Sequence, residues 1–344
     1  MKKQREININ WDKLGFEVLE TKSMFRAIYP KDGEWSDGEL IPYGPIELSP
    51  AAGVLNYGQG VFEGMKALRS SKGNVVLFRP DMNAKRIIRS SRRLCIPEID
   101  KYFFKNSVVK TVIDNLDYLP PFGRGSLYIR PILWGTEPVL GVRPVNEYTF
   151  IIFASPVGSY FKNGVKPLNL IINSDYHRAA PKGTGNAKAI GNYSASLYPL
   201  IEAKKQGFDE VIYLNAKHES RIEEAGSANI FIIKDNIVKT PYLDGSILPG
   251  VTRDSAIIVA KEILNLDVLE TEITIDEILY ADEVFCTGTA VVVNPVGSIT
   301  YQEEKLIIGD GEIGDWTSKV RDTLVGIQLQ EIDDPFGWVI TISE

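Results

Sequence analysis

The chain has 344 residues, of which 44% are hydrophobic and 24% are charged, and its formal net charge is −7. This length exceeds that of most domains built around a single hydrophobic core, so two domains are expected. The acidic balance gives no electrostatic reason to expect nucleic acid or an anionic membrane as a partner, and no apolar run is long enough to span a bilayer. These properties favour a protein that acts on small molecules.

The cysteines and histidines argue against a disulfide framework and a metal site. Cys95 and Cys286 lie far apart without a CxxC pattern, and the N-terminal MKKQREININWDK lacks the apolar core of a secretory signal. Both features favour a reducing cytoplasm, although the sequence leaves a pairing of the two cysteines open. His177 and His218 show no metal-ligand spacing, so no metal is expected.

Strand and helix patterns alternate in the first part of the chain. Runs rich in β-branched and aromatic residues predict strands at 24–29, 74–78, 126–134 and 147–154. Apolar spacing predicts a helix from about 81 to 95, with Asp81 as its N-cap after Pro80, and a second helix from about 100 to 115. The segment that follows is rich in glycine and proline and has little periodicity, which is typical of a linker.

The second part continues in the same manner. The patterns predict strands at 168–174, 210–214, 267–273 and 283–288, and a hairpin that turns at Lys234, Asp235 and Asn236. They predict helices at about 192–206, 251–264, 275–280 and 313–330. We therefore expect an α+β protein with mostly antiparallel neighbouring strands. The expected domains are 1–155 and 168–344, joined by an interdomain loop at 156–167.

The stretch AAPKGTGNAKAIGNY, residues 179–193, combines glycines with two lysines. Its spacing matches neither a P-loop nor a dinucleotide-binding fingerprint, so phosphate binding by the loop does not explain why Lys188 is there. An exposed lysine on a loop is one interpretation. The other is a partly desolvated lysine among small and apolar neighbours, whose amine can form a Schiff base.

Further segments could serve an anionic cofactor. The sequence LPGVTRD predicts a helix start at which the N–H groups of Val251 and Thr252 lack partners and can bind phosphate. Arg86 lies on a basic helix, CTGTA ends in small residues with accessible N–H groups, and RIEEAGSAN carries Glu223 and Glu224. Taken alone, the helix start is an ordinary cap, the basic helix a solvated face, CTGTA a turn, and the two glutamates surface carboxylates. Together they meet the needs of pyridoxal phosphate: a lysine, a carboxylate for the ring nitrogen and a cup for the phosphate.

The order of the motifs resembles a known family. The segments YGQGVFEGMKA, LFRPDMNAKRI, SLYIRPILWGTEPVLGV, NAKAIGNY, EEAGSANIF, LPGVTRD and CTGTA resemble those of branched-chain amino acid aminotransferases, which are fold-type IV pyridoxal-phosphate enzymes. The resemblance implies a smaller N-terminal α/β domain and a larger C-terminal domain with a barrel-like sheet, with the cofactor between them. It also implies transamination of leucine, isoleucine and valine with 2-oxoglutarate by ping-pong chemistry.

The resemblance also implies a role for individual residues. Lys188 corresponds to the Schiff-base lysine that moves the substrate's proton, Glu224 to the partner of the ring nitrogen, and Tyr193 to the partner of the ring hydroxyl. The phosphate cup corresponds to Arg86, Val251, Thr252 and Thr289. The N–H groups of Thr289 and Ala290 correspond to the donors for the substrate α-carboxylate.

The side-chain pocket and the oligomer follow from the same resemblance. Its aromatic wall corresponds to Tyr57, Phe62, Tyr128 and Tyr160. Arg130 corresponds to the residue that meets the second carboxylate of glutamate. A loop with Leu140 and Val142 corresponds to one that closes over the partner's pocket, which implies a homodimer.

Three alternatives stay open from the sequence. D-amino acid aminotransferases and aminodeoxychorismate lyases share the cofactor and fold, and a non-catalytic ligand-binding protein could retain the fold. The pairing of YIRP with GTA favours the branched-chain enzymes. The preference among leucine, isoleucine and valine is not encoded in any single motif, because one methylene changes specificity by only about 1–3 kcal/mol.

Overall fold

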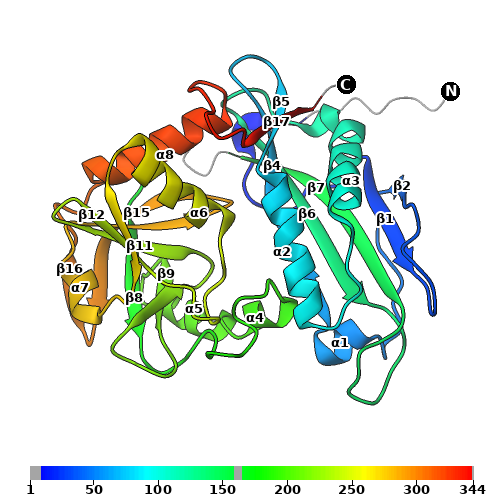
Figure 1. Cartoon of the computed structure of the whole chain (residues 1–344), viewed down its shortest axis with the longest axis horizontal. Helices are drawn as coiled ribbons and strands as arrows, with labels where there is room; N and C mark the ends of the chain where they lie inside the picture. The colour runs from blue at the N-terminus through cyan, green and yellow to red at the C-terminus, as the bar shows by residue number, and fades with distance from the viewer. Residues whose placement is uncertain (1–8, 159–164, 343–344) are drawn as a thin grey trace. The chain divides into compact units, whose positions relative to one another are not determined.

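A computed structural model describes residues 9–158 and 165–342 of the chain. The chain forms two compact units, one from Met1–Lys162 with Ile327–Glu344 and one from Asn163–Gly326. Each unit has its own sheet (Figure 1). Residues 327–344 therefore lie with the N-terminal unit, whereas the sequence patterns assigned them to the second domain.

The sheet of the first unit is antiparallel throughout its described pairings, in the order β17-β5-β4-β6-β7-β1-β2 with β3 beside β6. Its strands are β1 (Ser23–Tyr29), β2 (Glu39–Pro42), β3 (Gly60–Phe62), β4 (Met65–Arg69), β5 (Val75–Phe78), β6 (Gly125–Gly135), β7 (Tyr148–Gly158) and β17 (Val339–Ile342). The four strands predicted for this part of the chain are confirmed as β1, β5, β6 and β7.

Helices α2 and α3 confirm the two predicted helices of this unit. The helical segments are η1 (Trp11–Lys13), α1 (Gly53–Tyr57), α2 (Pro80–Arg93), α3 (Lys101–Asp114) and η2 (Leu116–Tyr118). The prediction of Asp81 as N-cap of α2 was wrong, because Arg79 takes that position and Pro80 is the first helical residue. Proline suits that place because its fixed φ is helical and its missing N–H would have no helical partner.

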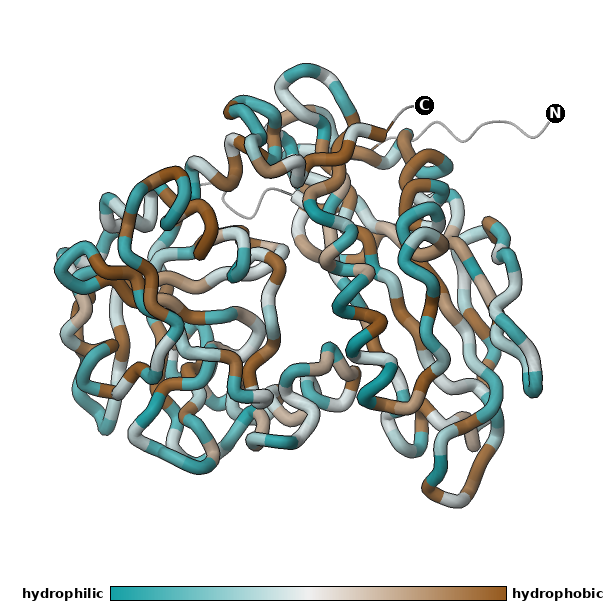
Figure 2. The backbone as a smooth tube through the Cα atoms, in the orientation of Figure 1, coloured by the Kyte–Doolittle hydropathy of each residue, from teal (hydrophilic) through white to brown (hydrophobic). Residues whose placement is uncertain are grey.

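The core of the first unit lies between the sheet and its helices. Phe25, Phe104 and Phe150 are almost completely buried and belong to one cluster. The ring centroid of Phe150 lies 6.3 Å from that of Phe25 and 6.0 Å from that of Phe104. Figure 2 shows the matching alternation of apolar and polar residues along these strands and helices. This packed sheet carries the candidate residues of β3 and β6.

The second sheet is mixed and curls into a half-barrel, in the order β10-β9-β8-β15-β14-β11-β12-β13 with β16 beside β15. Its strands are β8 (Leu168–Asn173), β9 (Glu210–Leu214), β10 (Ile222–Ala225), β11 (Asn229–Lys234), β12 (Ile237–Pro241), β13 (Asp267–Thr271), β14 (Glu283–Gly288), β15 (Val292–Tyr301) and β16 (Glu304–Ile307). Three pairings are parallel, namely β8 with β9, β8 with β15, and β12 with β13. Antiparallel neighbours still prevail, as the sequence predicted.

The predicted hairpin is confirmed as β11 and β12. Its two-residue turn consists of Asp235 and Asn236, which both have positive φ, at 50° and 62°. Aspartate and asparagine tolerate that conformation better than most residues, and it matches the twist of the two strands.

The helices of the second unit are α4 (Ile190–Ser194), α5 (Leu197–Lys205), α6 (Val251–Ile258), the π-helical turn η3 (Val259–Ile263), α7 (Ile275–Leu279) and α8 (Asp315–Gln328). The single helix predicted at 192–206 is divided into α4 and α5. Pro199 explains the division, because it has no N–H to donate to the carbonyl of Ala195. Among the described helices, none combines the length and apolar character needed to cross a membrane.

Candidate active site

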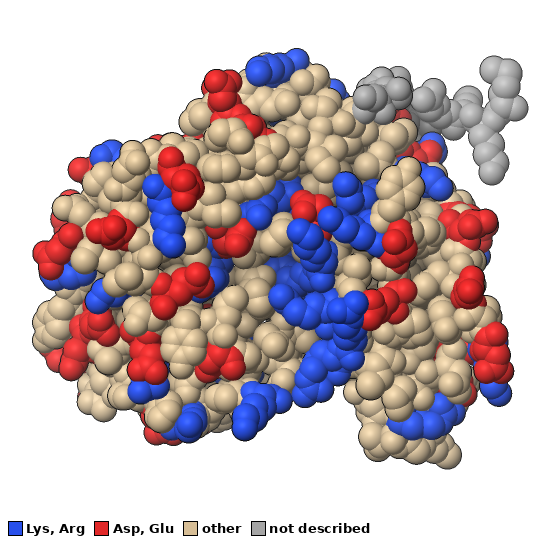
Figure 3. Space-filling view, in the orientation of Figure 1, with Lys and Arg blue, Asp and Glu red and all other residues tan. Residues whose placement is uncertain are grey.

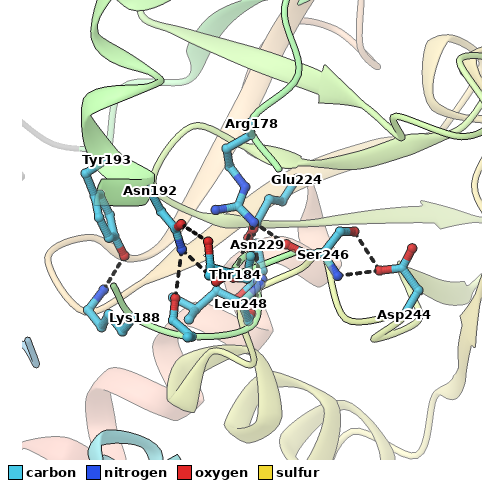
Figure 4. A network of polar contacts seen from close by, with 12 residues as sticks. Arg178, Thr184, Lys188, Asn192, Tyr193, Glu224, Asn229, Asp244, Ser246 and Leu248 are labelled. Atoms are coloured by element: carbon cyan, nitrogen blue, oxygen red, sulfur yellow. Dashed lines mark hydrogen bonds and ion pairs between the residues drawn. The ribbon is translucent and has the colours of Figure 1, made fainter. Parts of the chain in front are cut away.

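Lys188 lies directly before α4, and its side chain contacts a tyrosine of that helix. Its Nζ donates a hydrogen bond to the hydroxyl of Tyr193 over 2.7 Å, and the same nitrogen lies 4.9 Å from the centre of the tyrosine ring (Figure 4). The five-residue spacing of the motif thus places the amine and the phenol side by side.

The loop that carries Lys188 is held by hydrogen bonds on both sides. The side-chain amide of Asn192 donates to the carbonyls of Thr184 and Ala187 over 2.8 and 2.9 Å. The hydroxyl of Thr184 donates back to Asn192 over 2.7 Å. These bonds fix the backbone on either side of the lysine, so Asn192 helps to position Lys188 through the backbone.

Gly185 explains part of the glycine content of this loop. A Cβ atom at this position would lie 1.9 Å from the carbonyl oxygen of Ser246. The N–H of Asn186 donates to the carbonyl of Gly245 over 3.2 Å in the same region. The glycine is therefore needed because two backbone segments meet there.

Glu224 is buried on β10 and accepts hydrogen bonds on both carboxylate oxygens. Nη2 of Arg178 lies 2.6 Å from Oε1, and the N–H of Leu248 donates to the same oxygen over 3.1 Å. The amide of Asn229 donates to Oε2 over 3.0 Å. Burial raises the pKa of Glu224, while the charges of Arg178 and Lys188 and the Leu248 N–H act in the opposite direction.

Arg178 is a functional candidate that the sequence patterns missed. Its side chain is buried, and besides Glu224 it donates to the carbonyls of Ser246 and Gly185. The signal that could have indicated it is an arginine directly before the glycine-containing loop, in RAAPKGTG. Nothing in that pattern tells which carboxylate the arginine meets.

The start of α6 is joined to the same network. Its N-cap residue is Gly250, and no side chain caps the first turn that contains Val251 and Thr252. Asn229 connects this segment to the acid, because its amide donates both to Glu224 and to the carbonyl of Leu248, the latter over 2.8 Å. Asn229 thus links the segment that leads into α6 to the carboxylate of Glu224.

Thr289 and Ala290 follow the end of β14, which pairs with the strand that carries Asn229. Asn229 lies opposite Thr287 in that ladder. The contacts of the second unit therefore connect Lys188, Tyr193, Glu224 and the start of α6 into one region, and they place the GTA turn at the end of a neighbouring strand. This donor set fits pyridoxal phosphate: a positioned amine, a buried carboxylate with a fixed charge partner, and uncapped helical N–H groups.

Three candidates of the first unit form a second cluster. Nη2 of Arg130 donates to the hydroxyl of Tyr128 over 3.2 Å, and the guanidinium carbon lies 4.8 Å from the ring centre of Phe62. Both Tyr128 and Arg130 are on β6, two residues apart, so they emerge on the same face of the sheet. The structure thus combines aromatic surface with one cationic group.

The remaining pocket candidates are Tyr57, Leu140, Val142 and Tyr160. The hydroxyl of Tyr57 donates to the carbonyl of Leu140. The side chains of Leu140 and Val142 are 88% and 87% exposed. Tyr160 lies outside the described residues.

Arg86 is buried on α2 and forms a bidentate ion pair with Glu63. Its Nε and Nη2 atoms each lie 2.7 Å from one oxygen of that carboxylate, and Asn83 donates to Glu63 over 2.8 Å. A guanidinium has five N–H donors, of which Glu63 takes two. Figure 3 shows that lysine and arginine side chains gather along α2.

Comparisons with known proteins agree with this chemistry. The family model for class IV amino-transferases matches residues 60–299. The chain is 48% identical to the chloroplastic branched-chain-amino-acid aminotransferase 5 of Arabidopsis thaliana, over 97% of this chain and 80% of that protein. It is 43% identical to branched-chain-amino-acid aminotransferase 2 of Bacillus subtilis (strain 168), over 96% of this chain and 93% of that protein.

Solved structures give the same result. The branched-chain amino acid aminotransferase of Escherichia coli matches with a TM-score of 0.82 and 28% identity, over 94% of this chain and 100% of that one. The branched-chain aminotransferase of Thermoproteus uzoniensis, solved with norvaline, matches with a TM-score of 0.79 and 29% identity, over 93% of this chain and 100% of that one. The chain therefore belongs to the branched-chain amino acid aminotransferase family, within the pyridoxal-phosphate-dependent class IV aminotransferases.

Proposed function

We propose that the chain transfers the amino group of L-leucine, L-isoleucine and L-valine to 2-oxoglutarate and releases branched 2-oxo acids and L-glutamate. The observation that carries this proposal is the joining of the Lys188–Tyr193 pair to the buried Arg178–Glu224 pair through one loop. Pyridoxal phosphate, when bound, supplies an aldehyde for an amine and a ring that delocalises the electrons left after loss of the Cα proton.

We assign the proton transfer to Nζ of Lys188. In its neutral form this amine accepts the Cα proton of the amino acid and later donates it, which is general base and then general acid chemistry at one atom. The hydroxyl of Tyr193, 2.7 Å from Nζ, fixes where the amine points. Asn192 and Thr184 restrict the backbone, so the amine is held in position before the reaction.

Glu224 is assigned to the ring nitrogen of the cofactor. An ionised carboxylate there keeps that nitrogen protonated, and this makes the ring an effective electron sink. The pair with Arg178 stabilises the ionised form of Glu224 in a buried place where an isolated charge is costly. The phosphate is assigned to Arg86, the hydroxyl of Thr289 and the first-turn N–H groups of Val251 and Thr252.

Substrate recognition is assigned to two sets of residues. The N–H groups of Thr289 and Ala290 bind the α-carboxylate. Tyr57, Phe62, Tyr128 and Tyr160 contact the side chain, with Leu140 and Val142 contributed by a closing loop. Arg130 binds the distal carboxylate of glutamate, because a buried carboxylate without a cation would be strongly unfavourable. Its position over the Phe62 ring lets the same pocket receive aliphatic side chains.

We also propose a cytoplasmic homodimer. Support for the compartment comes from Cys95 and Cys286, which are both free thiols. Support for the dimer comes from an apolar groove of about 350 Å³ in the first unit, lined by Met24, Ile46, Leu55, Ile132 and Trp134 among others. Apolar grooves of this size on a protein surface commonly mark interaction sites.

The test of the function is an assay of the purified protein with pyridoxal phosphate and 2-oxoglutarate. Production of glutamate from L-leucine, L-isoleucine and L-valine, and none from D-alanine, is expected. Exclusive use of D-alanine would replace this function with that of a D-amino acid aminotransferase.

The lysine assignment is tested by Lys188→Ala. We expect turnover to fall by at least about 10²–10⁴-fold, and the visible absorption of the bound cofactor to disappear because its covalent attachment is lost. Lys182→Ala is the matched control, since Lys182 is an exposed lysine of the same loop. Normal colour and activity in the Lys188 variant would refute the assignment.

A further inference from the structure

Glu223 is a buried carboxyl group next to the cofactor acid that has no role in the proposed mechanism. Its side chain is 1% exposed, and neither carboxylate oxygen has a hydrogen-bond partner among the described residues. A buried carboxyl group without hydrogen bonds is rare, because the ionised form loses its hydration without replacement. Such a group needs either a structural or a functional reason.

A β-bulge explains why Glu223 lies so close to the ion pair. In a regular strand, Glu223 and Glu224 would point to opposite faces of the sheet. The pairing of β10 with β9 is irregular here, since Ile222 lies opposite Leu214 while Ala225 lies opposite Ile212. The strand β10 therefore contains one extra residue, and bulges of this kind redirect side chains next to active sites.

Three charged groups act on Glu223 from the segments around it. Arg178, before the lysine loop, attracts a negative charge on Glu223, whereas Glu224 on β10 and Asp244, after β12, repel one. Burial dominates and raises the pKa of Glu223 to about 7, above the usual glutamate value. The hydroxyl of Ser246 also faces Glu223 and favours its ionised form, but it donates its proton to Asp244 over 2.6 Å. Ser246 therefore lies between two carboxyl groups and has one hydroxyl proton to donate.

The network adjoins a cavity on the side of Asp244. This residue lines a cavity of about 180 Å³ together with Asn215, His218 and Arg221. Glu223, Ser246 and Asp244 therefore follow one another toward this cavity.

We propose that Glu223 is a titrating positioning residue of the cofactor site. When Glu223 is protonated, Arg178 pairs with Glu224 alone. When Glu223 is ionised, it competes with Glu224 for Arg178 and adds a negative charge beside Glu224. The step is the transfer of one proton between Glu223 and water, with no other bond made or broken. This inference rests on the proposed role of Glu224, because the added charge acts on the groups that Glu224 contacts.

The experiment compares wild type, Glu223→Gln and the matched control Glu210→Gln. Glu210 is a half-buried glutamate of the same sheet, and burial raises its pKa as well, but it lies on β9 outside the network of Glu224. The visible absorption of the holoprotein is titrated from about pH 5.5 to 8.5. We expect an inflection near pH 7 in wild type and in Glu210→Gln, and its loss in Glu223→Gln. Ser246→Ala should move the inflection to higher pH, since the serine hydroxyl favours the ionised form.

A second measurement does not use the cofactor. When the pKa of a carboxyl group is higher in the folded than in the unfolded protein, the folded protein binds more protons between the two pKa values. The free energy of unfolding therefore falls as pH rises from the unfolded pKa, about 4.3, through the folded pKa. The urea midpoint of apo wild type should therefore fall relative to that of Glu223→Gln between these pH values. The same pH dependence of midpoint and absorption in wild type and Glu223→Gln would overturn the proposal. A protein that shows no cofactor absorption at all, in contrast, would refute the proposed function itself.

Discussion

The buried ion pair between Arg178 and Glu224 is the residue-scale feature on which the proposed chemistry depends. Both side chains are almost completely buried, at 6% and 4% exposure, and the paired atoms are 2.6 Å apart. A buried pair contributes little net stability compared with apolar residues, but the removal of one partner leaves an uncompensated charge. We infer that this pair is present to fix the charge of Glu224.

Arg178→Met should destabilise the protein by about 3–5 kcal/mol, because Glu224 would remain buried without its cation. It should also weaken cofactor binding, since Glu224 would then bind a proton itself. Urea unfolding and a cofactor titration measure the two effects. Adding Glu224→Gln to this variant should restore part of the stability but not the cofactor affinity.

Arg253→Met is the comparison for that substitution; the charge of Arg253 also favours the ionised form of Glu224, but its ion pair is with Glu270. Arg253 is 4% exposed and pairs with Glu270, whose side chain is 45% exposed. Water can hydrate the carboxylate that this change leaves behind, so the loss of stability should be smaller. An equal loss in both variants would show that the burial of Glu224 is not what makes Arg178 important.

At the scale of elements, the sequence predicted most strands and helices and missed some of the shortest, among them β2 and β3. β6 and β7 are long and rich in β-branched and aromatic residues, so their pattern was clear. β3 has three residues and β2 has four, which is too short for a period of two to be visible. The bulge in β10 was also missed, because it depends on pairing with β9 and not on local composition.

The residues of the candidate site also divide into those that the sequence predicted and those that it missed. The motif order identified Lys188, Tyr193 and Glu224, and the structure brings the first two into contact. Arg178 and Asn229 were missed because their roles come from long-range contacts, with Glu224 and Leu248 as partners. The roles assigned to the pocket residues remain predictions.

The lysine loop gives an element-scale prediction. Gly185→Ala places a methyl group where the backbone of Ser246 already lies, so the loop has to move. We expect a loss of stability of about 1–3 kcal/mol from overpacking, with a parallel loss of cofactor affinity as Lys188 is displaced.

Gly191→Ala in α4 provides the comparison. Nothing lies within 4 Å of a Cβ atom at that position, and alanine is more favourable than glycine in a helix by up to about 1 kcal/mol. This variant should retain both stability and cofactor binding, as measured by urea unfolding and fluorescence titration. If Gly185→Ala behaves in the same way, the close approach to Ser246 does not constrain the loop.

At the scale of the whole molecule, the proposed dimer places exposed apolar side chains against a second copy. Val142→Asp should then weaken self-association, because a buried aspartate without a partner is costly. Sedimentation velocity over a range of protein concentrations measures the dissociation constant. Tyr102→Asp is the control, since Tyr102 is a 73% exposed aromatic residue on α3 with no proposed interface role. A wild-type protein that sediments as a monomer would contradict the proposal.

The pairing of β17 with β5 affects the order in which the molecule can be assembled on the ribosome. Residues 75–78 form their ladder with residues 339–342, so this part of the first sheet cannot form until residues 339–342 have been made. The second unit is one continuous segment, 163–326, and is synthesised completely before β17. During translation, the half of the protein that is synthesised second is therefore the first that can close its own sheet.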